Sequence, residues 1–353
     1  MSDTADISLY DVTPRQARRE CVEIMEAGLV PFLESSPGMG KSSLFASICD
    51  EYGMDLIDYR LSTAVPEDFN GLPRFDEDGM AYFAPFAKTF PVKGISQMRK
   101  NQNGWLLFMD EANHGTKLVQ SASYKVVLDK AIGQFDLHEN VMIAMAGNLA
   151  SDRANVQPMS TALESRVVKL TMRLDFDEFL EDVAIPQEWD SRVIAYLNYK
   201  GGLRTLMDFK PDYKERGEKS FNSPRTWDFV NRMCKGKKVE ARKAATFAGT
   251  LTSGTAADFV QFCAVMDTQI SIKEVMADPK NCPLPSDNGS RWGVTTHLLE
   301  HVTEDTLDSV SEFIDRFDIT YRILFYRGVR LKPKLRAHPA FTKRIVELSN
   351  YLN

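Results

Sequence analysis

The sequence lacks the features that mark membrane, secreted and metal-ribbon proteins. No apolar run in its 353 residues approaches the roughly 18 residues that a membrane-spanning helix needs. Its N-terminal segment also lacks the apolar stretch of a secretory signal. The five cysteines are scattered and form no CxxC pair, which argues against a disulfide framework or a zinc ribbon. We therefore expect a reduced, soluble, cytoplasmic protein with no membrane partner.

Basic residues are in deficit, and internal repeats and low-complexity tracts are absent. With 43 Lys and Arg against 49 Asp and Glu, the net charge is −6, which argues against general binding to nucleic acid phosphates. A short basic strip at residues 327–336 is the local exception. Hydrophobic residues make up 43% of the chain, which is enough for a sizeable core and excludes global disorder. The length predicts two or three domains.

Short apolar runs alternate with helical patterns in the first half of the chain. The runs cover residues 29–34, 55–61, 105–110 and 141–147, and the helical patterns cover residues 14–28 and 42–52. This alternation predicts an α/β core over residues 1–175 with a doubly wound parallel sheet. Strand patterns fade beyond residue 173. We expect an all-α lid over residues 176–268 and a helical C-terminal extension over residues 269–353.

A phosphate-loop pattern, SSPGMGKSS, lies between the first apolar run and a helix. Such loops turn successive backbone N–H groups toward phosphates, while the lysine binds the β- and γ-phosphates and the hydroxyl binds Mg²⁺. Ser35 stands where the pattern has glycine, and the alternative is an ordinary polar turn. The predicted phosphate-binding residues are Ser36, Pro37, Gly38, Met39, Gly40, Lys41, Ser42 and Ser43.

An acidic pair ends the apolar run LLFMDE. Ligands of open α/β sheets bind at the carboxyl ends of the strands. Asp110 is therefore predicted to hold Mg²⁺ together with Ser42, and Glu111 to deprotonate a water that attacks the γ-phosphate. A solvated loop start is the alternative for such a pair.

Five motifs occur in an order that resembles the AAA+ ATPases of the MoxR and dynein-related (AAA_5-like) group. They are GMGKSS, LLFMDEANHG followed by VQSASYKVVLD, AMAGN, ALESR and NSPRTW, within residues 10–260. The resemblance implies an AAA+ nucleotide-binding core with a lid, ATP and Mg²⁺ as cofactors, and a homo-oligomeric ring, commonly a hexamer. It also implies a client or co-chaperone protein as partner, and the family suggests a partner that contains a von Willebrand A domain.

The resemblance also suggests roles for residues that the pattern of the chain leaves open. Asn148 matches the residue called sensor 1, which holds the attacking water, although an asparagine in a Gly-Asn turn is the simpler alternative. Asn113 fits the group's DExN pattern. His114 stands where relatives more often have arginine, and we assign it no role.

Two arginines match the family's remaining catalytic positions. Arg166 in ALESR matches the arginine finger, which reaches the nucleotide of a neighbouring subunit. A surface arginine paired with Glu164 is the alternative. Arg225 in NSPRTW matches sensor 2, which couples the lid to the γ-phosphate. Ser223 is predicted to cap the helix that carries it, with Pro224 in the first turn.

Residues 68–85 read as an inserted hairpin with its turn at Asp78-Gly79. In the resembling family such insertions touch the client, which would make Phe75, Tyr82 and Phe83 contact residues. Aromatic residues at a period of two are more often hairpin core, and we favour that interpretation.

A second motif competes with the phosphate loop for a catalytic function. Residues His297 to His301 read HLLEH, which is the HxxEH pattern of inverted zinc peptidases. Few residues follow it, and a pair of histidines on a half-buried helix is the simpler interpretation.

The leading hypothesis is therefore an ATP hydrolase that assembles into a ring and remodels or loads a partner protein. The alternatives are a nucleotide-gated scaffold with little turnover, a nucleic-acid remodelling AAA+ protein and, more remotely, a zinc metallopeptidase.

Overall fold

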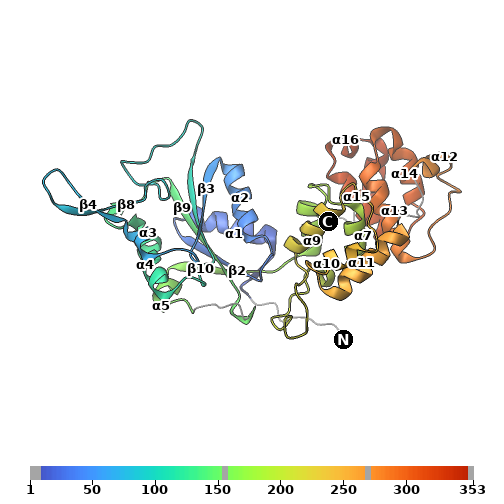
Figure 1. Ribbon diagram of the computed structural model, residues 1–353. Coiled ribbons are helices and arrows are strands. Elements are labelled where there is room, and N and C mark those ends of the chain that lie inside the picture. The colour runs from blue at the N-terminus through green and yellow to red at the C-terminus, as the bar shows by residue number, and fades with distance from the viewer. Residues whose placement is uncertain (1–8, 153–157, 267–271, 349–353) are drawn as a thin grey trace. The chain divides into compact units, whose positions relative to one another are not determined.

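The computed structural model describes residues 9–152, 158–266 and 272–348. Contacts divide the chain into two compact units, Met1–Leu174 and Asp175–Asn353 (Figure 1). The division falls beside the predicted end of the α/β core at residue 175. The further boundary that we predict between residues 268 and 269 stays a prediction. None of the helices in the described residues is long and apolar enough to cross a membrane.

The first unit is built on a six-stranded parallel sheet, which confirms the predicted fold class. Its strand order is β1-β10-β2-β9-β6-β3. The strands are β1 (Asp11–Val12), β2 (Val30–Ser35), β3 (Met54–Arg60), β6 (Gly104–Asp110), β9 (Val141–Asn148) and β10 (Val167–Met172). The order places β9 between β2 and β6, so the phosphate loop after β2 and the acidic pair after β6 both lie next to the end of β9.

Helices cover both faces of this sheet, as continuous apolar strands require. All seven residues of β6 are buried. One hydrophobic cluster joins α1 and α2 to one face, and a second joins α3, α4 and α5 to the other. These helices are α1 (Pro14–Glu26), α2 (Lys41–Tyr52), α3 (Pro66–Asn70), α4 (Lys117–Asp129) and α5 (Thr161–Glu164), with a 3₁₀ turn at Ala150–Asp152.

The ends of the first two helices follow from local chemistry. Thr13 caps α1 in a capping box with Gln16, and Pro14 occupies the first turn, where a missing N–H costs nothing. Gly53 ends α2 with φ of 65°, in the left-handed region that glycine adopts without strain. Both predicted helices are confirmed to within two residues at each end.

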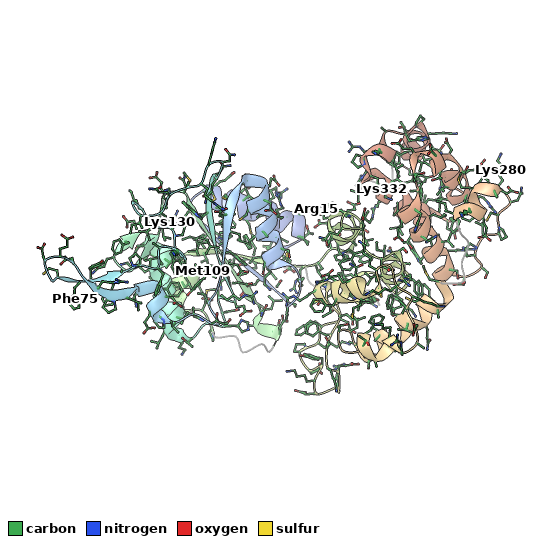
Figure 2. All side chains as sticks on the ribbon, turned by 45° about the horizontal axis from the view of Figure 1, so that its top comes forward. Arg15, Phe75, Met109, Lys130, Lys280 and Lys332 are labelled. Carbon is green, nitrogen blue, oxygen red and sulfur yellow. The ribbon has the colours of Figure 1, made fainter. Side chains whose placement is uncertain are left out.

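The predicted hairpin is present as the antiparallel pair β4 (Leu72–Phe75) and β5 (Ala81–Ala84). Phe75 is 74% exposed and Phe83 is 46% exposed, so the interpretation of these rings as hairpin core is wrong. A lone two-stranded ribbon has no second layer against which to bury them. Figure 2 shows Phe75 on the part of the hairpin that projects from the sheet. A second small hairpin pairs β7 (Ala131–Ile132) with β8 (Phe135–Asp136).

The second unit is helical, as the fading strand pattern predicts. One hydrophobic cluster of this unit is formed by residues between Val275 and Leu348, with Phe313, Phe325 and Tyr326 fully buried, and further buried residues such as Trp227 and Phe259 come from α9 and α11. Its elements are α6 (Phe176–Phe179), a π-helical turn (Leu180–Ala184), α7 (Ser191–Tyr199), α8 (Leu203–Leu206), α9 (Pro224–Cys234), α10 (Lys243–Phe247), α11 (Ser253–Met266), α12 (Ile272–Ala277), α13 (Asn288–His301), a 3₁₀ turn (Glu304–Thr306), α14 (Leu307–Ile314), α15 (Ile319–Arg330), α16 (Pro333–Arg336) and α17 (Pro339–Glu347). None of the five cysteines forms a disulfide, and all are buried.

Two phenylalanines of the first unit test this assignment of core and surface. Phe108 on β6 is fully buried against Phe45, with ring centroids 4.6 Å apart. We expect Phe108→Ala to lower the free energy of unfolding by about 3–5 kcal/mol, because it leaves a cavity between sheet and helix. Phe75→Ala is the matched control and should change it by less than about 0.5 kcal/mol. Denaturant unfolding measures both, and equal losses would contradict the assignment.

Candidate functional site

The phosphate loop spans residues 36–40 between the end of β2 and the start of α2. Gly38 and Gly40 have φ of 79° and 92°, in the left-handed region that other residues enter only with strain. A Cβ on Gly40 would meet no atom within 4 Å, so the requirement for glycine there comes from the backbone angle. The loop leads into the 12-residue helix α2, whose first N–H groups and positive dipole end are of the kind that bind anions.

Lys41 is the buried charge at this site. Its ammonium donates to the backbone oxygen of Ser35 at 3.1 Å, to the Ser35 hydroxyl at 3.0 Å and to Asn148 Oδ1 at 3.1 Å. Ser35, which stands where the phosphate-loop pattern has glycine, therefore holds Lys41 with its side chain. Because Ser35 and Asn148 are register partners on neighbouring strands, the sheet itself brings Asn148 to the lysine.

Ser42 and Asp110 are also brought together. The Ser42 hydroxyl donates to Asp110 Oδ2 at 2.9 Å, and Asp110 Oδ1 accepts from the Glu111 N–H at 2.7 Å. Asp110 ends β6 and is only 8% exposed. A hydroxyl and a carboxylate are hard oxygen donors of the type that Mg²⁺ prefers, so these two predicted metal ligands fit that ion.

Glu111 is held by Arg60, the last residue of β3, and by Ser62 just beyond that strand, neither of which the sequence pattern singles out. Its carboxylate accepts from the Ser62 hydroxyl and lies 3.8 Å from the Arg60 guanidinium. Its φ of 53° is unusual for a residue other than glycine and marks local strain. Arg60 is the register partner of Asp110. Only the sheet order could have identified Arg60 and Ser62, because 49 residues separate Ser62 from Glu111.

Asn113 fixes the position of Asn148. Its side-chain amide donates to the Asn148 carbonyl at 2.6 Å, and its Oδ1 accepts from the Asn148 N–H at 3.1 Å. A Cβ on Gly147 would lie 2.7 Å from Asn113 Oδ1 and 2.8 Å from the Phe32 ring, so this glycine permits the close approach. The two asparagines thus tie the loop after β6 to the end of β9.

The structure adds Asp152, which the sequence did not single out. Asp152 ends the 3₁₀ turn after β9 and is 8% exposed. Burial raises the pKa of its carboxyl above the ordinary value of 3.8, although the Ser36 and Ser151 hydroxyls and the charge of Lys41 act to lower it. The signal in the sequence is weak, because a single aspartate in a polar loop is normally solvated.

Arg166 lies exposed just beyond α5. Within the residues that the structure describes, none of its hydrogen bonds reaches the loop between β2 and α2. Its Nη1 donates to the Ala162 carbonyl at 2.6 Å and to the Ser165 hydroxyl at 3.0 Å. The guanidinium stacks over the Tyr124 ring, 4.8 Å from its centroid. The alternative pairing with Glu164 is wrong, since the ion pair that Glu164 forms is with Lys169, at 2.7 Å.

Arg225 belongs to the second unit and is exposed in the first turn of α9. The predicted start of this helix is confirmed. Ser223 accepts from the Thr226 N–H and forms a capping box with it, and Pro224 is in the first turn.

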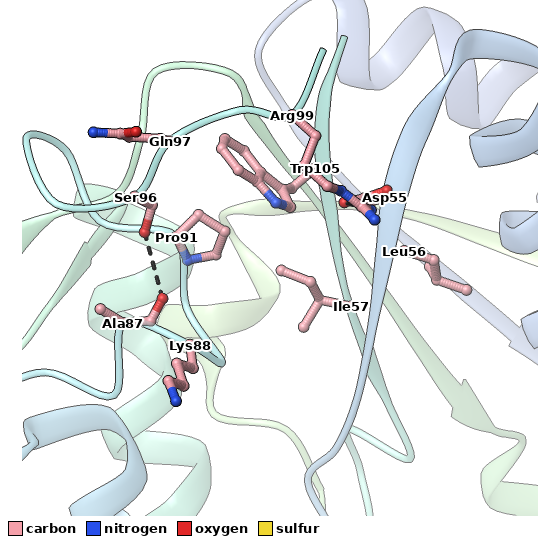
Figure 3. A pocket seen from close by; sticks show the side chains of 10 residues that line it. All are labelled: Asp55, Leu56, Ile57, Ala87, Lys88, Pro91, Ser96, Gln97, Arg99 and Trp105. Atoms are coloured by element: carbon pink, nitrogen blue, oxygen red, sulfur yellow. Dashed lines mark hydrogen bonds and ion pairs between the residues drawn. The ribbon is translucent and has the colours of Figure 1, made fainter. Parts of the chain in front are cut away.

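Two further features involve none of these residues. A cavity of about 500 Å³ lies beside β3 and is lined by residues of that strand, by Trp105 and by the segment that includes Lys88, Ser96 and Arg99 (Figure 3). No residue of the predicted phosphate site lines it. On α13, the predicted HxxEH triad His297, Glu300 and His301 has ligand atoms that all lie within 4.8 Å of one another.

No protein-family model and no curated protein matches the chain. Among solved structures, a mutant of RuvB from Thermotoga maritima is similar with 16% identity and a TM-score of 0.37, over 85% of this chain and 89% of that one. The RuvB Holliday junction branch migration motor of the same organism has 14% identity and a TM-score of 0.36, over 84% and 87%. Likeness at this level assigns neither an activity nor a partner to this chain.

The pKa of Asp152 predicts a pH-dependent stability. Because the folded-state pKa is raised, the ionised carboxylate destabilises the fold at neutral pH, and this cost disappears as the pH falls below the ordinary value of 3.8. We expect Asp152→Asn to melt at a higher temperature than the parent protein at neutral pH, with the difference shrinking in acid. Asp50→Asn on α2 is the exposed control. A melting difference for Asp152→Asn that does not change with pH would contradict the assignment.

Proposed function

We propose that this chain is an AAA+ ATPase of the MoxR-like group that hydrolyses ATP, assembles into a hexameric ring and remodels or loads a partner protein. The observation that carries the proposal is the pair of contacts across three strand ends, Lys41 to Asn148 and Ser42 to Asp110. These four side chains come from three of the motifs that carry the resemblance. A polar turn, a solvated acidic pair and a Gly-Asn turn would not need to meet at one point.

The chemistry assigned to the site follows from its donors. The N–H groups of residues 36–43 and the ammonium of Lys41 bind the β- and γ-phosphates. Mg²⁺, held by Ser42 and Asp110, would offset the charge of the phosphate oxygens. Glu111 accepts a proton from the water that attacks the γ-phosphorus, while Asn148 orients that water. The bond from the γ-phosphorus to the bridging oxygen breaks, and the leaving group is ADP.

Glu111 must change partners before it can act in this way. In the structure its carboxylate is engaged by Ser62 and Arg60. A carboxylate that accepts a hydroxyl hydrogen bond and faces a guanidinium is not positioned to take a proton from a water molecule. The described arrangement is therefore that of a resting site.

The oligomeric part of the proposal depends on Arg166. An arginine finger that acts on a neighbouring subunit has to be exposed on its own subunit, and Arg166 is exposed and held over Tyr124. A guanidinium suits the task because it stays charged and can bridge phosphate oxygens. Arg225 would couple the lid to the nucleotide, and the von Willebrand A domain partner is taken from the family resemblance alone.

Hydrolysis by a Glu111 base is the first test. We expect Glu111→Gln to lower the rate of phosphate release from Mg·ATP by roughly 10²-fold or more, because the amide cannot accept the proton, while nucleotide binding persists. Glu77→Gln in the hairpin turn is the control and should match the parent protein. Equal turnover in the parent and in Glu111→Gln would favour the nucleotide-gated scaffold. Turnover that rises with nucleic acid and falls with salt would favour nucleic-acid remodelling.

Catalysis across a subunit boundary is the second test. We expect specific activity to rise with protein concentration as the ring forms, and Arg166→Ala to assemble but lose roughly 10³-fold in turnover. Phosphate release and mass photometry on the same samples measure both, with Arg242→Ala as an exposed control. If turnover does not depend on concentration or on Arg166, the ring proposal fails, although hydrolysis in a single subunit remains measurable.

A further inference from the structure

Three side chains on the last turns of α13 (Asn288–His301) form a compact donor set. His297, Glu300 and His301 stand at positions i, i+3 and i+4, which places them within an arc of about 100° on one side of the helix. One donor atom from each lies within 4.8 Å of the others. Two imidazoles and one carboxylate are the donors found in three-ligand zinc sites.

A hydrogen bond fixes the chemical form of one of these imidazoles. His301 Nδ1 lies 3.0 Å from the carbonyl oxygen of His297. A carbonyl oxygen can only accept, so Nδ1 carries the proton and donates it. The lone pair of the ring is then on Nε2, the atom left to bind a metal. Histidines that bind metals typically donate their second ring N–H to a backbone carbonyl or a carboxylate in this way.

The position of the donors on the helix also suits a cation. Leu298 and Leu299 of α13 pack into the core and His297 is half-buried, whereas the side chains of Glu300 and His301 are 47% and 49% exposed. An ion from solvent can therefore reach them. The negative end of the helix dipole lies in this last turn and stabilises positive charge.

The positive charge of Lys332 lies at the same end of α13. Its ammonium donates to the carbonyls of Leu299 at 2.6 Å and of Glu300 at 3.3 Å, and so caps the end of the helix. Leu299 is two residues from both histidines, so its carbonyl lies on another side of the helix. Lys332 thus holds the last turn in place without occupying the donor atoms.

We propose that His297, Glu300 and His301 bind one divalent transition-metal ion, represented here by zinc, with a water molecule as the fourth ligand. Bonds of about 2.1 Å in a tetrahedral site separate donor atoms by about 3.4 Å. Rotations of the half-buried His297 side chain and of the exposed Glu300 and His301 side chains must therefore bring His301 Nε2 and the other two donor atoms to that spacing. Because Glu300 is a ligand here, the site has no separate base of the kind that the HxxEH peptidases use. It is a binding site, and the ion cross-links the last turn of α13.

The test is titration of the metal-free full chain with zinc chloride by calorimetry, with Mg²⁺ in excess to occupy the site at Ser42 and Asp110. We expect one equivalent to bind and to raise the melting temperature, because the ion binds the folded state only. Each of the three ligand variants should weaken zinc binding by roughly 10-fold or more, because loss of a group that only supports a ligand already costs about that much. The variants are His297→Ala, His301→Ala and Glu300→Gln. His338→Ala, in the same unit, is the control and should leave the affinity unchanged.

Two results would overturn the proposal. One is less than about a tenth of an equivalent of zinc bound by the parent protein at micromolar concentrations. The other is zinc binding that survives His297→Ala and His301→Ala, which would place the ion elsewhere. Circular dichroism of each metal-free variant shows whether it is folded, and Glu300→Gln, which keeps the shape of the side chain, tests the site if an alanine variant is not. None of these results depends on ATP hydrolysis.

Discussion

The burial of the Lys41 ammonium is the constraint on which the rest of the first unit depends. A buried charge is tolerated only when it is surrounded by partners, because its desolvation costs several kcal/mol. Three oxygens from Ser35 and Asn148 provide them. They are in place only if β2 and β9 are neighbours in this register, and only if Asn113 holds Asn148 with its two hydrogen bonds. The loop, the sheet and the second asparagine are thus parts of one arrangement.

The acidic end of β6 shows how this arrangement separates two adjacent carboxylates. Asp110 is buried and bonded to Ser42, whereas Glu111 turns away with a positive φ toward Arg60 and Ser62. Glu111 lies one residue beyond β6, and its left-handed backbone turns its carboxylate toward the end of β3 while Asp110 contacts Ser42. If the chain hydrolyses ATP, the contact with Arg60 keeps the base occupied until something displaces it.

The two units carry their proposed ligand sites in different ways. The phosphate site is assembled from strand ends that are far apart in the sequence, so it exists only when the sheet is complete. The proposed metal site lies within five consecutive residues of one helix and needs only that α13 be helical there. Loss of either site would therefore leave the other measurable.

By itself the sequence determined the local elements, including the glycine-containing loop between β2 and α2. Continuous apolar runs, glycines at left-handed positions and caps such as Thr13 and Ser223 act within a few residues of one another, so their outcome can be predicted from local rules. The contacts of Arg60, Ser62 and Asp152 and the exposure of Phe75 were decided by tertiary structure. Each depends on which strand or segment becomes a neighbour, and that choice is made by the burial of the whole sheet between two layers of helices. No short window of the sequence contains that information, because the residues that meet are far apart along the chain. Asn113 and Asn148 are separated by 35 positions, Ser62 and Glu111 by 49, and Lys41 and Asn148 by 107.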